Sequence, residues 1–127
     1  MVSEQQMKQA LQAYIDAFNR SDAAGIVALY ADQATVEDPV GSPPMQGREA
    51  IAKFYDMGIA TGAKLKLAAP IRGSHGNSAA MAFDVELNMP QGPARIRVID
   101  VMTFDAEGRF ASMRAFWGPG DMEMLAP

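Results

Sequence analysis

The sequence predicts an α+β fold in which helices come first and antiparallel strands follow. Up to Gly62, most apolar residues recur at helical spacing, whereas beyond it they alternate with polar residues, as in strands that bury one face. This order along the chain is typical of helices packed on one face of a sheet. If the sheet is curved, the fold is a cone with a pocket between its concave face and the three helices.

Caps and apolar stripes predict the three N-terminal helices. Ser3 and Gln6 are spaced as a capping box, Asp22 caps a second, shorter helix, and Gly47 leads into the third. The inward stripes are Met7, Leu11, Tyr14, Ile15 and Phe18 in the first helix, Ile26, Leu29 and Tyr30 in the second, and Ile51, Phe54, Tyr55, Gly58 and Ile59 in the third. Each helix therefore presents one tyrosine on its apolar face.

The strands are predicted from alternation and from the turns between them. A short strand over 34–38 lies between the second and third helices, and Pro39 after it favours an extended Asp38. The later strands are expected over 63–70, 79–89 and 95–104, with a last one carrying Met113 and Trp117. We expect one domain spanning 1–127, with a loose tail at 118–127.

Composition excludes several classes of function. The net charge of −4 argues against nucleic acid or an anionic membrane as a partner. The absence of cysteine excludes thiol catalysis, and the one histidine, His75, lies in a glycine-flanked turn predicted to be surface. We therefore expect no metal site. The N-terminal residues do not resemble a leader peptide, and no stretch is long enough to span a membrane, so a cytoplasmic location is expected.

Asp100 interrupts an otherwise apolar row. The inward face of the 95–104 strand otherwise consists of Ile96, Val98, Met102 and Phe104. A carboxylate in apolar surroundings either becomes neutral or takes a dedicated partner. Asp100 is thus a candidate functional carboxyl, although a structural hydrogen bond, or a bulge that turns it outward, would also explain it.

Asp38 is the second candidate carboxyl. Alternation places it on the inward side of the 34–38 strand and places Glu37 toward water, but Asp38 could instead cap the loop at Pro39. The hydroxyls of Tyr14, Tyr30 and Tyr55 could converge in the same interior, or form only a structural network. Four further inward residues could line an apolar pocket or simply belong to the core: Met81, Phe83, Met113 and Trp117.

Together these residues suit one kind of chemistry. An ionised carboxylate can remove a proton next to a carbonyl, while neutral hydroxyl and carboxyl donors stabilise the enolate oxygen that forms. An apolar cavity that keeps one carboxyl charged and the other protonated would supply both functions.

The sequence resembles the ketosteroid isomerases (steroid Δ5-isomerases) over nearly its whole length. The resemblance is densest in 29–39, in Gly47-Arg48-Glu49 with Phe54-Tyr55, in 98–102 and in 113–117. This family is a known example of a carboxylic acid kept neutral so that it can donate a hydrogen bond. The resemblance implies the cone-shaped fold of nuclear transport factor 2, a homodimer, a small-molecule steroid substrate and no cofactor or metal.

The resemblance also implies a role for each matching residue. Asp38 matches the general base that moves a proton from C4 to C6 of a 3-oxo-Δ5-steroid, and Tyr14 and Asp100 match the two donors to the C3 oxygen. Tyr30 and Tyr55 match the supporting tyrosines. The apolar walls are matched by Phe54, Phe83, Met113 and Trp117.

Two alternatives stay open on sequence alone. The same scaffold hosts dehydratases, cyclases and epoxide hydrolases, which typically use a histidine or an Arg-Asp pair in the cavity. A non-catalytic ligand-binding or dimerisation module is the other alternative, and it predicts an Asp38 that faces solvent.

Overall fold

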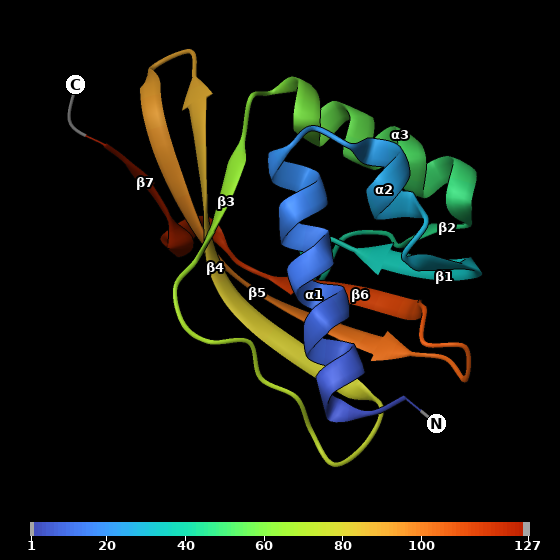
Figure 1. The fold of residues 1–127 in the computed structure, drawn as a ribbon. Helices are drawn as coiled ribbons and strands as arrows, with labels where there is room; N and C mark the ends of the chain where they lie inside the picture. The colour runs from blue at the N-terminus through green and yellow to red at the C-terminus, as the bar shows by residue number, and fades with distance from the viewer. Residues whose placement is uncertain (1, 126–127) are drawn as a thin grey trace.

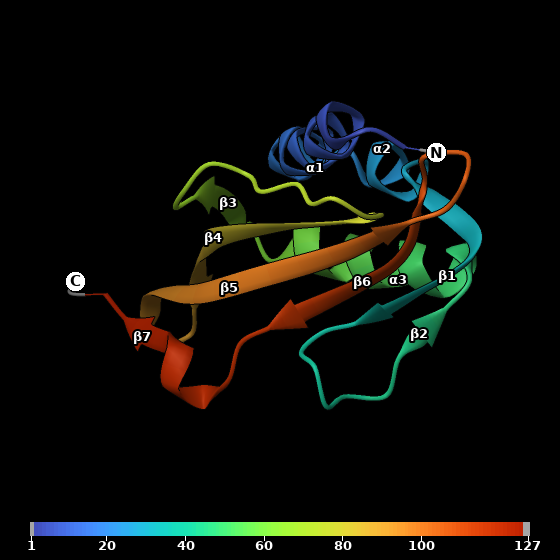
Figure 2. The same ribbon diagram turned by 90° about the horizontal axis from the view of Figure 1, so that it is seen from below.

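The computed structural model describes residues 2–125 and confirms the predicted α+β class (Figure 1). Three helices lie against one side of a curved, open sheet, and the long strands β4 and β5 bend around them (Figures 1 and 2). The elements are α1 (Glu4–Asn19), α2 (Ala23–Val27), β1 (Tyr30–Glu37), β2 (Met45–Gln46), α3 (Arg48–Ala60), β3 (Lys64–Leu67), β4 (Ser78–Met89), β5 (Gly92–Phe104), β6 (Phe110–Phe116), the 3-10 turn η1 (Pro119–Asp121) and β7 (Met122–Met124).

The sheet is mixed but mostly antiparallel. Its order is β2-β1-β6-β5-β4-β3, with β7 pairing β5 beyond the end of β6. Only β1 and β6 run parallel among the strand pairs of the described residues. The pairing of β4 with β5 is continuous, from the pair Ser78 and Thr103 to the pair Met89 and Gly92 at the hairpin turn. This long hairpin is the main part of the curved sheet.

Helix α1 begins where the sequence predicts. The Ser3 hydroxyl accepts the Gln6 backbone N–H, and the Gln6 side chain accepts the Ser3 backbone N–H, so the capping box is complete. The apolar stripe of α1 is buried against the sheet and includes Tyr14. Helix α3 begins after Gly47, whose φ of +88° lies in the left-handed region that favours glycine.

The second helix is shorter than predicted, and Tyr30 is not helical. Helix α2 ends at Val27, and Tyr30 is the first residue of β1, where it pairs with Phe110 of β6. The Phe110 backbone N–H donates to the Leu29 carbonyl at 2.8 Å, so β6 provides the extended chain with its partner. The spacing of Ile26, Leu29 and Tyr30 fits a helix equally well, which is why the pattern misled.

The tail is more ordered than predicted. After Trp117 the chain forms η1 and then β7, whose three residues pair antiparallel with Ala94, Arg95 and Ile96 of β5. The expected loose tail at 118–127 is therefore wrong as far as Leu125; residues 126–127 lie outside the described residues.

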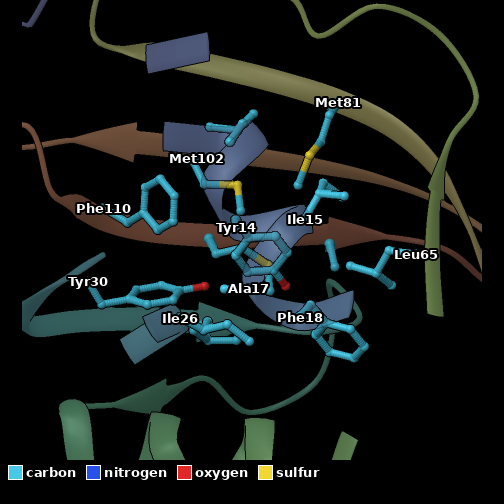
Figure 3. Packing of buried hydrophobic residues seen from close by; sticks show 14 of the residues in the cluster. Tyr14, Ile15, Ala17, Phe18, Ile26, Tyr30, Leu65, Met81, Met102 and Phe110 are labelled. Carbon is cyan, nitrogen blue, oxygen red and sulfur yellow. The ribbon is translucent and has the colours of Figure 1, made fainter. Parts of the chain in front are cut away.

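The core fills the space between α1 and the sheet, with Tyr14 and Tyr30 among its aliphatic and sulfur-containing side chains (Figure 3). Asp100 is the one buried polar or charged residue among those described, with 1% of its surface exposed. No helix within residues 2–125 has the length and apolar character needed to cross a membrane.

Candidate active site

A cavity of about 280 Å³ lies between the helices and the concave face of the sheet. This volume is just below the range of roughly 300–1,000 Å³ typical of small-molecule sites. Most of its surface is apolar, and its titratable groups are Tyr14, Asp38, Tyr55 and Asp100. The other lining residues are Phe18, Phe54, Gly58, Thr61, Ala63, Leu65, Phe83, Val85, Leu87, Ile96, Val98 and Trp117.

The three tyrosine hydroxyls converge into one hydrogen-bonded chain. Tyr55 donates to Tyr14 at 3.0 Å, and the Tyr30 and Tyr55 hydroxyls are 2.5 Å apart. Because a hydroxyl has one proton and Tyr55 gives its proton to Tyr14, Tyr30 must be the donor to Tyr55. The Tyr14 proton is then free to point into the cavity.

Burial keeps these phenols protonated. It is the main cause that raises the pKa of Tyr14, Tyr30 and Tyr55 well above the usual value of a phenol. The nearby Asp100 carboxyl raises the pKa of Tyr14 further, and the hydrogen bond from Tyr55 acts in the opposite direction. Tyr14 is thus a neutral donor whose acceptor side is already occupied by Tyr55.

Asp100 points inward from the middle of β5 with regular pairing on both sides, to Met81 of β4 and Ala115 of β6. The register shift of β5 lies further on, between Thr103 and Phe104, so a bulge does not turn Asp100 outward. Neither carboxyl oxygen has a hydrogen-bond partner within residues 2–125, so the structural-bond explanation is not observed there either. A buried carboxyl without partners in a cavity wall is left available to a ligand.

The pKa of Asp100 is raised well above the usual carboxyl value. The main cause is burial, and the negative charge of Asp38 adds to it. A protonated carboxyl in this position presents an O–H donor to the cavity, next to the phenol of Tyr14.

Asp38 lies just after β1, half-buried, with its side chain in the cavity wall. The indole N–H of Trp117 donates to its Oδ1 at 2.8 Å. Burial raises the pKa of Asp38, while the bond from Trp117 lowers it. The pKa of Asp100, which has no such donor, is raised the more strongly of the two.

The loop after Asp38 is capped by its neighbour. Glu37 accepts the Gly41 backbone N–H at 3.0 Å and pairs with Arg114 on the outer side of the sheet. Asp38 is therefore free of the capping role that the sequence left open. The two adjacent acids have separate functions, one toward the loop and one toward the cavity.

The predicted walls are mostly in place. Phe54, Phe83 and Trp117 line the cavity, whereas Met113 does not. Met113 is 1% exposed and lies on β6 between Val36 of β1 and Met102 of β5, so it belongs to the core beyond the cavity. The expectation that it forms a wall is wrong because alternation identifies inward residues but not how far along a strand the cavity extends. Met81 is likewise core.

The sequence did not identify the part of the cavity wall formed by β4, β5 and the segment between α3 and β3. Val85 and Leu87 of β4 and Ile96 and Val98 of β5 line it, and all four belong to rows that alternation had marked as inward. Thr61 and Ala63 between α3 and β3 also contribute, and nothing in their sequence pattern signals this. Within the part of the chain that is described, no three acidic or histidine side chains gather as metal ligands.

The arrangement places a proton acceptor and two hydrogen-bond donors in one apolar cavity. Asp38 can exist as a carboxylate that accepts a proton, whereas Tyr14 and Asp100 offer two neutral O–H donors. Donors fixed in an apolar site stabilise a developing oxyanion far better than they would in water. The site is equipped for proton abstraction beside a carbonyl group.

The protein has the cone-shaped α+β fold. Its curved sheet and three helices enclose an apolar cavity that carries carboxyl groups and has the character of a small-molecule site. The sequence profile of the SnoaL-like domain matches residues 11–113. A steroid Delta-isomerase from Nocardioides simplex is 44% identical, over 92% of this chain and 94% of that protein. The chain belongs to the SnoaL-like domain family and, within it, to the ketosteroid isomerase family of enzymes, as its motifs indicated.

Other relatives on the scaffold carry different names. The epoxide hydrolase LasB of Streptomyces lasalocidi is 27% identical over 98% of this chain, which spans about half (51%) of that protein. The solved structure of SalBIII, described as an epoxide hydrolase/cyclase-like enzyme with a role in pyran ring formation in the polyether salinomycin, superposes with a TM-score of 0.90. It is 30% identical, and the match covers 98% of this chain and 100% of that one.

Proposed function

We propose that this protein converts a 3-oxo-Δ5-steroid into its conjugated Δ4 isomer, using Asp38 as the proton carrier. The observation that carries the proposal is the pair of cavity carboxyls with different surroundings: Asp38 hydrogen-bonded by Trp117, Asp100 buried without a partner among the described residues. The steroid Delta-isomerase relative supplies the substrate class.

In the proposed first step, the Asp38 carboxylate removes a proton from C4. The C4–H electron pair becomes the C3–C4 double bond, and the carbonyl electrons move to the C3 oxygen, which gives a dienolate. In the second step the protonated Asp38 delivers the same proton to C6, the C3 carbonyl re-forms, and the remaining double bond lies between C4 and C5. Nothing is consumed, and Asp38 returns to its ionised form.

Tyr14 and Asp100 are the proposed donors to the C3 oxygen. The chain from Tyr30 through Tyr55 orients the Tyr14 hydroxyl and increases its donor strength, because hydrogen bonds in series polarise one another. Asp100 must be neutral to donate, which its burial favours. The steroid would lie on the apolar walls that include Phe54, Phe83 and Trp117.

The cavity composition favours this reaction over its rivals. Within residues 2–125, neither a histidine nor an arginine is among the lining residues, so the groups typical of the dehydratase and epoxide hydrolase alternatives are not found there. The non-catalytic module predicts an Asp38 that faces solvent, whereas Asp38 is in the cavity wall and bonded to Trp117. Both contrasts support the isomerase.

A homodimer is the proposed assembly. Ile99 of β5 and Phe116 of β6 are direct cross-strand neighbours on the outer face of the sheet, and they are 49% and 41% exposed. Contiguous exposed apolar side chains mark interaction surfaces, and this pair supports a contact between two copies of the chain here. Sedimentation of the wild type and of Phe116→Glu tests it: we expect a dimer and a monomer, and a monomeric wild type would refute it. The cytoplasmic location stays a prediction from the sequence.

The test of the function is the absorbance of the conjugated enone when purified protein meets 5-androstene-3,17-dione, with Asp38→Asn assayed beside it. Conversion that is fast in the wild type and lost in the variant establishes the reaction, the substrate class and the base together. A folded protein that binds the steroid without converting it would refute the proposal, and other enolisable ketones would then be screened.

A further inference from the structure

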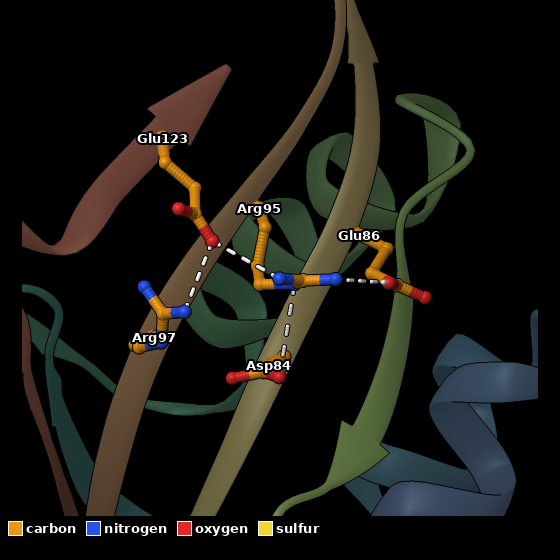
Figure 4. Close-up of polar contacts among 5 residues, drawn as sticks. All are labelled: Asp84, Glu86, Arg95, Arg97 and Glu123. Carbon is orange, nitrogen blue, oxygen red and sulfur yellow. Dashed lines mark hydrogen bonds and ion pairs between the residues drawn. The ribbon is translucent and has the colours of Figure 1, made fainter. Parts of the chain in front are cut away.

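A cluster of charged side chains ties the C-terminal strand β7 to the outer face of β5. Glu123 of β7 approaches both Arg95 and Arg97, and its Oε1 is 3.0 Å from a guanidinium nitrogen of each (Figure 4). We call these three residues the β7 clamp. Two neighbouring arginines repel one another, so the carboxylate they share stabilises both.

The side chains of the β7 clamp are partly shielded from solvent and belong to a larger network of ion pairs. Arg95 is 30% exposed and also approaches Asp84 and Glu86 of β4 at 3.8 and 3.5 Å, so it faces three acids (Figure 4). Partly buried ion pairs that share members are less screened than isolated surface pairs. Among the residues of this network, only Glu123 lies outside the β4–β5 hairpin.

Within residues 2–125, strand β7 has few other attachments. It comprises three residues paired with β5, followed by one more bond from the Leu125 backbone N–H to the Pro93 carbonyl. Short terminal strands open readily unless side chains fix them. The clamp is therefore a main side-chain attachment of this end of the chain.

The segment held by the clamp leads back to the proposed base. Trp117 precedes Glu123 by six residues, and the turn between them is closed by two bonds between Gly118 and Asp121, at 2.8 and 2.9 Å. A closed turn of this length can change its end-to-end distance only slightly. A displacement of β7 would therefore displace Trp117. The indole of Trp117 then donates to Asp38 at 2.8 Å.

We propose that Glu123 is a positioning residue: through the β7 clamp it holds the Trp117 indole on the carboxylate of Asp38. The base function of Asp38 rests on the proposed function, whereas the link from Glu123 to the Trp117–Asp38 contact does not. The clamp acts through the chain, because none of its residues lines the cavity. The titratable and polar side chains that share the cavity with Asp38 are the Trp117 indole, the Asp100 carboxyl, the Tyr14 and Tyr55 phenols and the Thr61 hydroxyl.

Trp117 is the one tryptophan of the sequence, so its fluorescence tests the link without any substrate. The wild type, Glu123→Gln and two controls are titrated across the acidic range while the emission is recorded. Asp38→Asn removes the titrating carboxyl, and Glu107→Gln removes one negative charge from the turn between β5 and β6, at the other end of β5. We expect a step in wild-type emission that Asp38→Asn abolishes, Glu123→Gln reduces by about half or more, and Glu107→Gln leaves unchanged.

Activity is the second readout. With 5-androstene-3,17-dione we expect Glu123→Gln to lower kcat/KM by about three- to tenfold. High salt, which screens the ion pairs, should lower the kcat/KM of the wild type toward that of the variant. Arg97→Gln, which removes one arm of the clamp, should reduce the emission step by a smaller amount and serves if Glu123→Gln folds poorly. Glu123→Asp, which keeps the charge, should restore part of the step.

The outcomes separate the two proposals. A Glu123→Gln protein that melts earlier but keeps the full emission step has lost only stability, and the inference is then wrong. A wild type whose emission is as flat as that of Asp38→Asn also overturns it, because Trp117 then does not sense Asp38. If the emission results are as expected but no variant or wild type converts the steroid, the proposed function fails while the positioning link stands.

Discussion

The two carboxyls of the cavity occupy contrasting regions of the molecule. Asp38 lies at the end of β1, half-buried, with the Trp117 indole as its donor. Asp100 lies in the centre of β5, 1% exposed, with no partner for either oxygen within residues 2–125. Burial raises the pKa of both carboxyls, but the neutral form is favoured less strongly at Asp38, whose indole partner stabilises the ionised form, than at Asp100, which has no such donor.

Removing the carboxylate of the first region should have the largest effect. Asp38→Asn keeps the shape and the acceptor oxygen for Trp117 but cannot carry a proton, so we expect turnover to fall by about 10²–10⁴-fold or more. Steroid binding should remain nearly intact, since the walls are unchanged. Initial rates and a binding titration measure the two quantities, and unchanged turnover would remove Asp38 from the mechanism.

Removing donors from the second region should have the next largest effects, and in a fixed order. Tyr14→Phe loses a donor supported by two further phenols, so we expect a loss of about 10²–10³-fold in kcat. Asp100→Ala loses a donor without such support and should lose less. Steady-state kinetics of both variants decide the order, and a larger loss in Asp100→Ala would contradict it.

Trp117→Phe tests the contrast, because it removes the hydrogen-bond donor of Asp38 and leaves this carboxyl without a side-chain partner among the described residues, as Asp100 is. The indole bond favours the ionised form, so its loss should raise the pKa of Asp38 further. A base is active only when ionised, and activity is lost as the pH falls through its pKa. The acidic limb of the kcat/KM profile should therefore move to higher pH, with a smaller loss at the plateau than in Tyr14→Phe. A limb that stays in place would mean that the bond has no effect on ionisation.

The smallest expected effect is on the pH dependence of stability, and Asp100→Asn tests it. The pKa of Asp100 is raised in the folded state, so the unfolded chain ionises first as the pH rises. Asp100 therefore lowers the free energy of unfolding progressively above the ordinary carboxyl pKa, up to its folded pKa. Melting temperatures at several pH values should show Asp100→Asn gaining on the wild type as the pH rises through that window. A difference independent of pH would contradict a raised pKa.

Much of this contrast was predictable from the sequence. Alternation along β5 placed Asp100 in the apolar row. Val36 and Asp38 are two residues apart and so share one face of a strand, which placed the second carboxyl inward. Capping chemistry located α1, because it depends on residues three positions apart. These are local rules, and they succeeded where neighbours along the chain decide the structure.

The errors concern partners that are distant in sequence. Tyr30 is extended because β6, eighty residues later, pairs with it, and β7 pairs with β5, where Glu123 meets Arg95 and Arg97. Met113 lies in the core rather than in the cavity, and alternation along β6 does not show where the cavity ends. The contact between Trp117 and Asp38 joins residues 79 positions apart, which no spacing rule predicts.

The position of β5 has a consequence for how activity is lost. This strand has partners along both edges, with β4 on one side and β6 and β7 on the other, and Asp100 lies in its doubly paired part. Backbone amides of such a strand exchange with solvent mainly when the whole protein unfolds. Asp100 therefore lies in what should be the slowest-exchanging segment, so the backbone that carries this proposed donor should keep its position until global unfolding, and activity lost in urea below that point should come from other parts of the site.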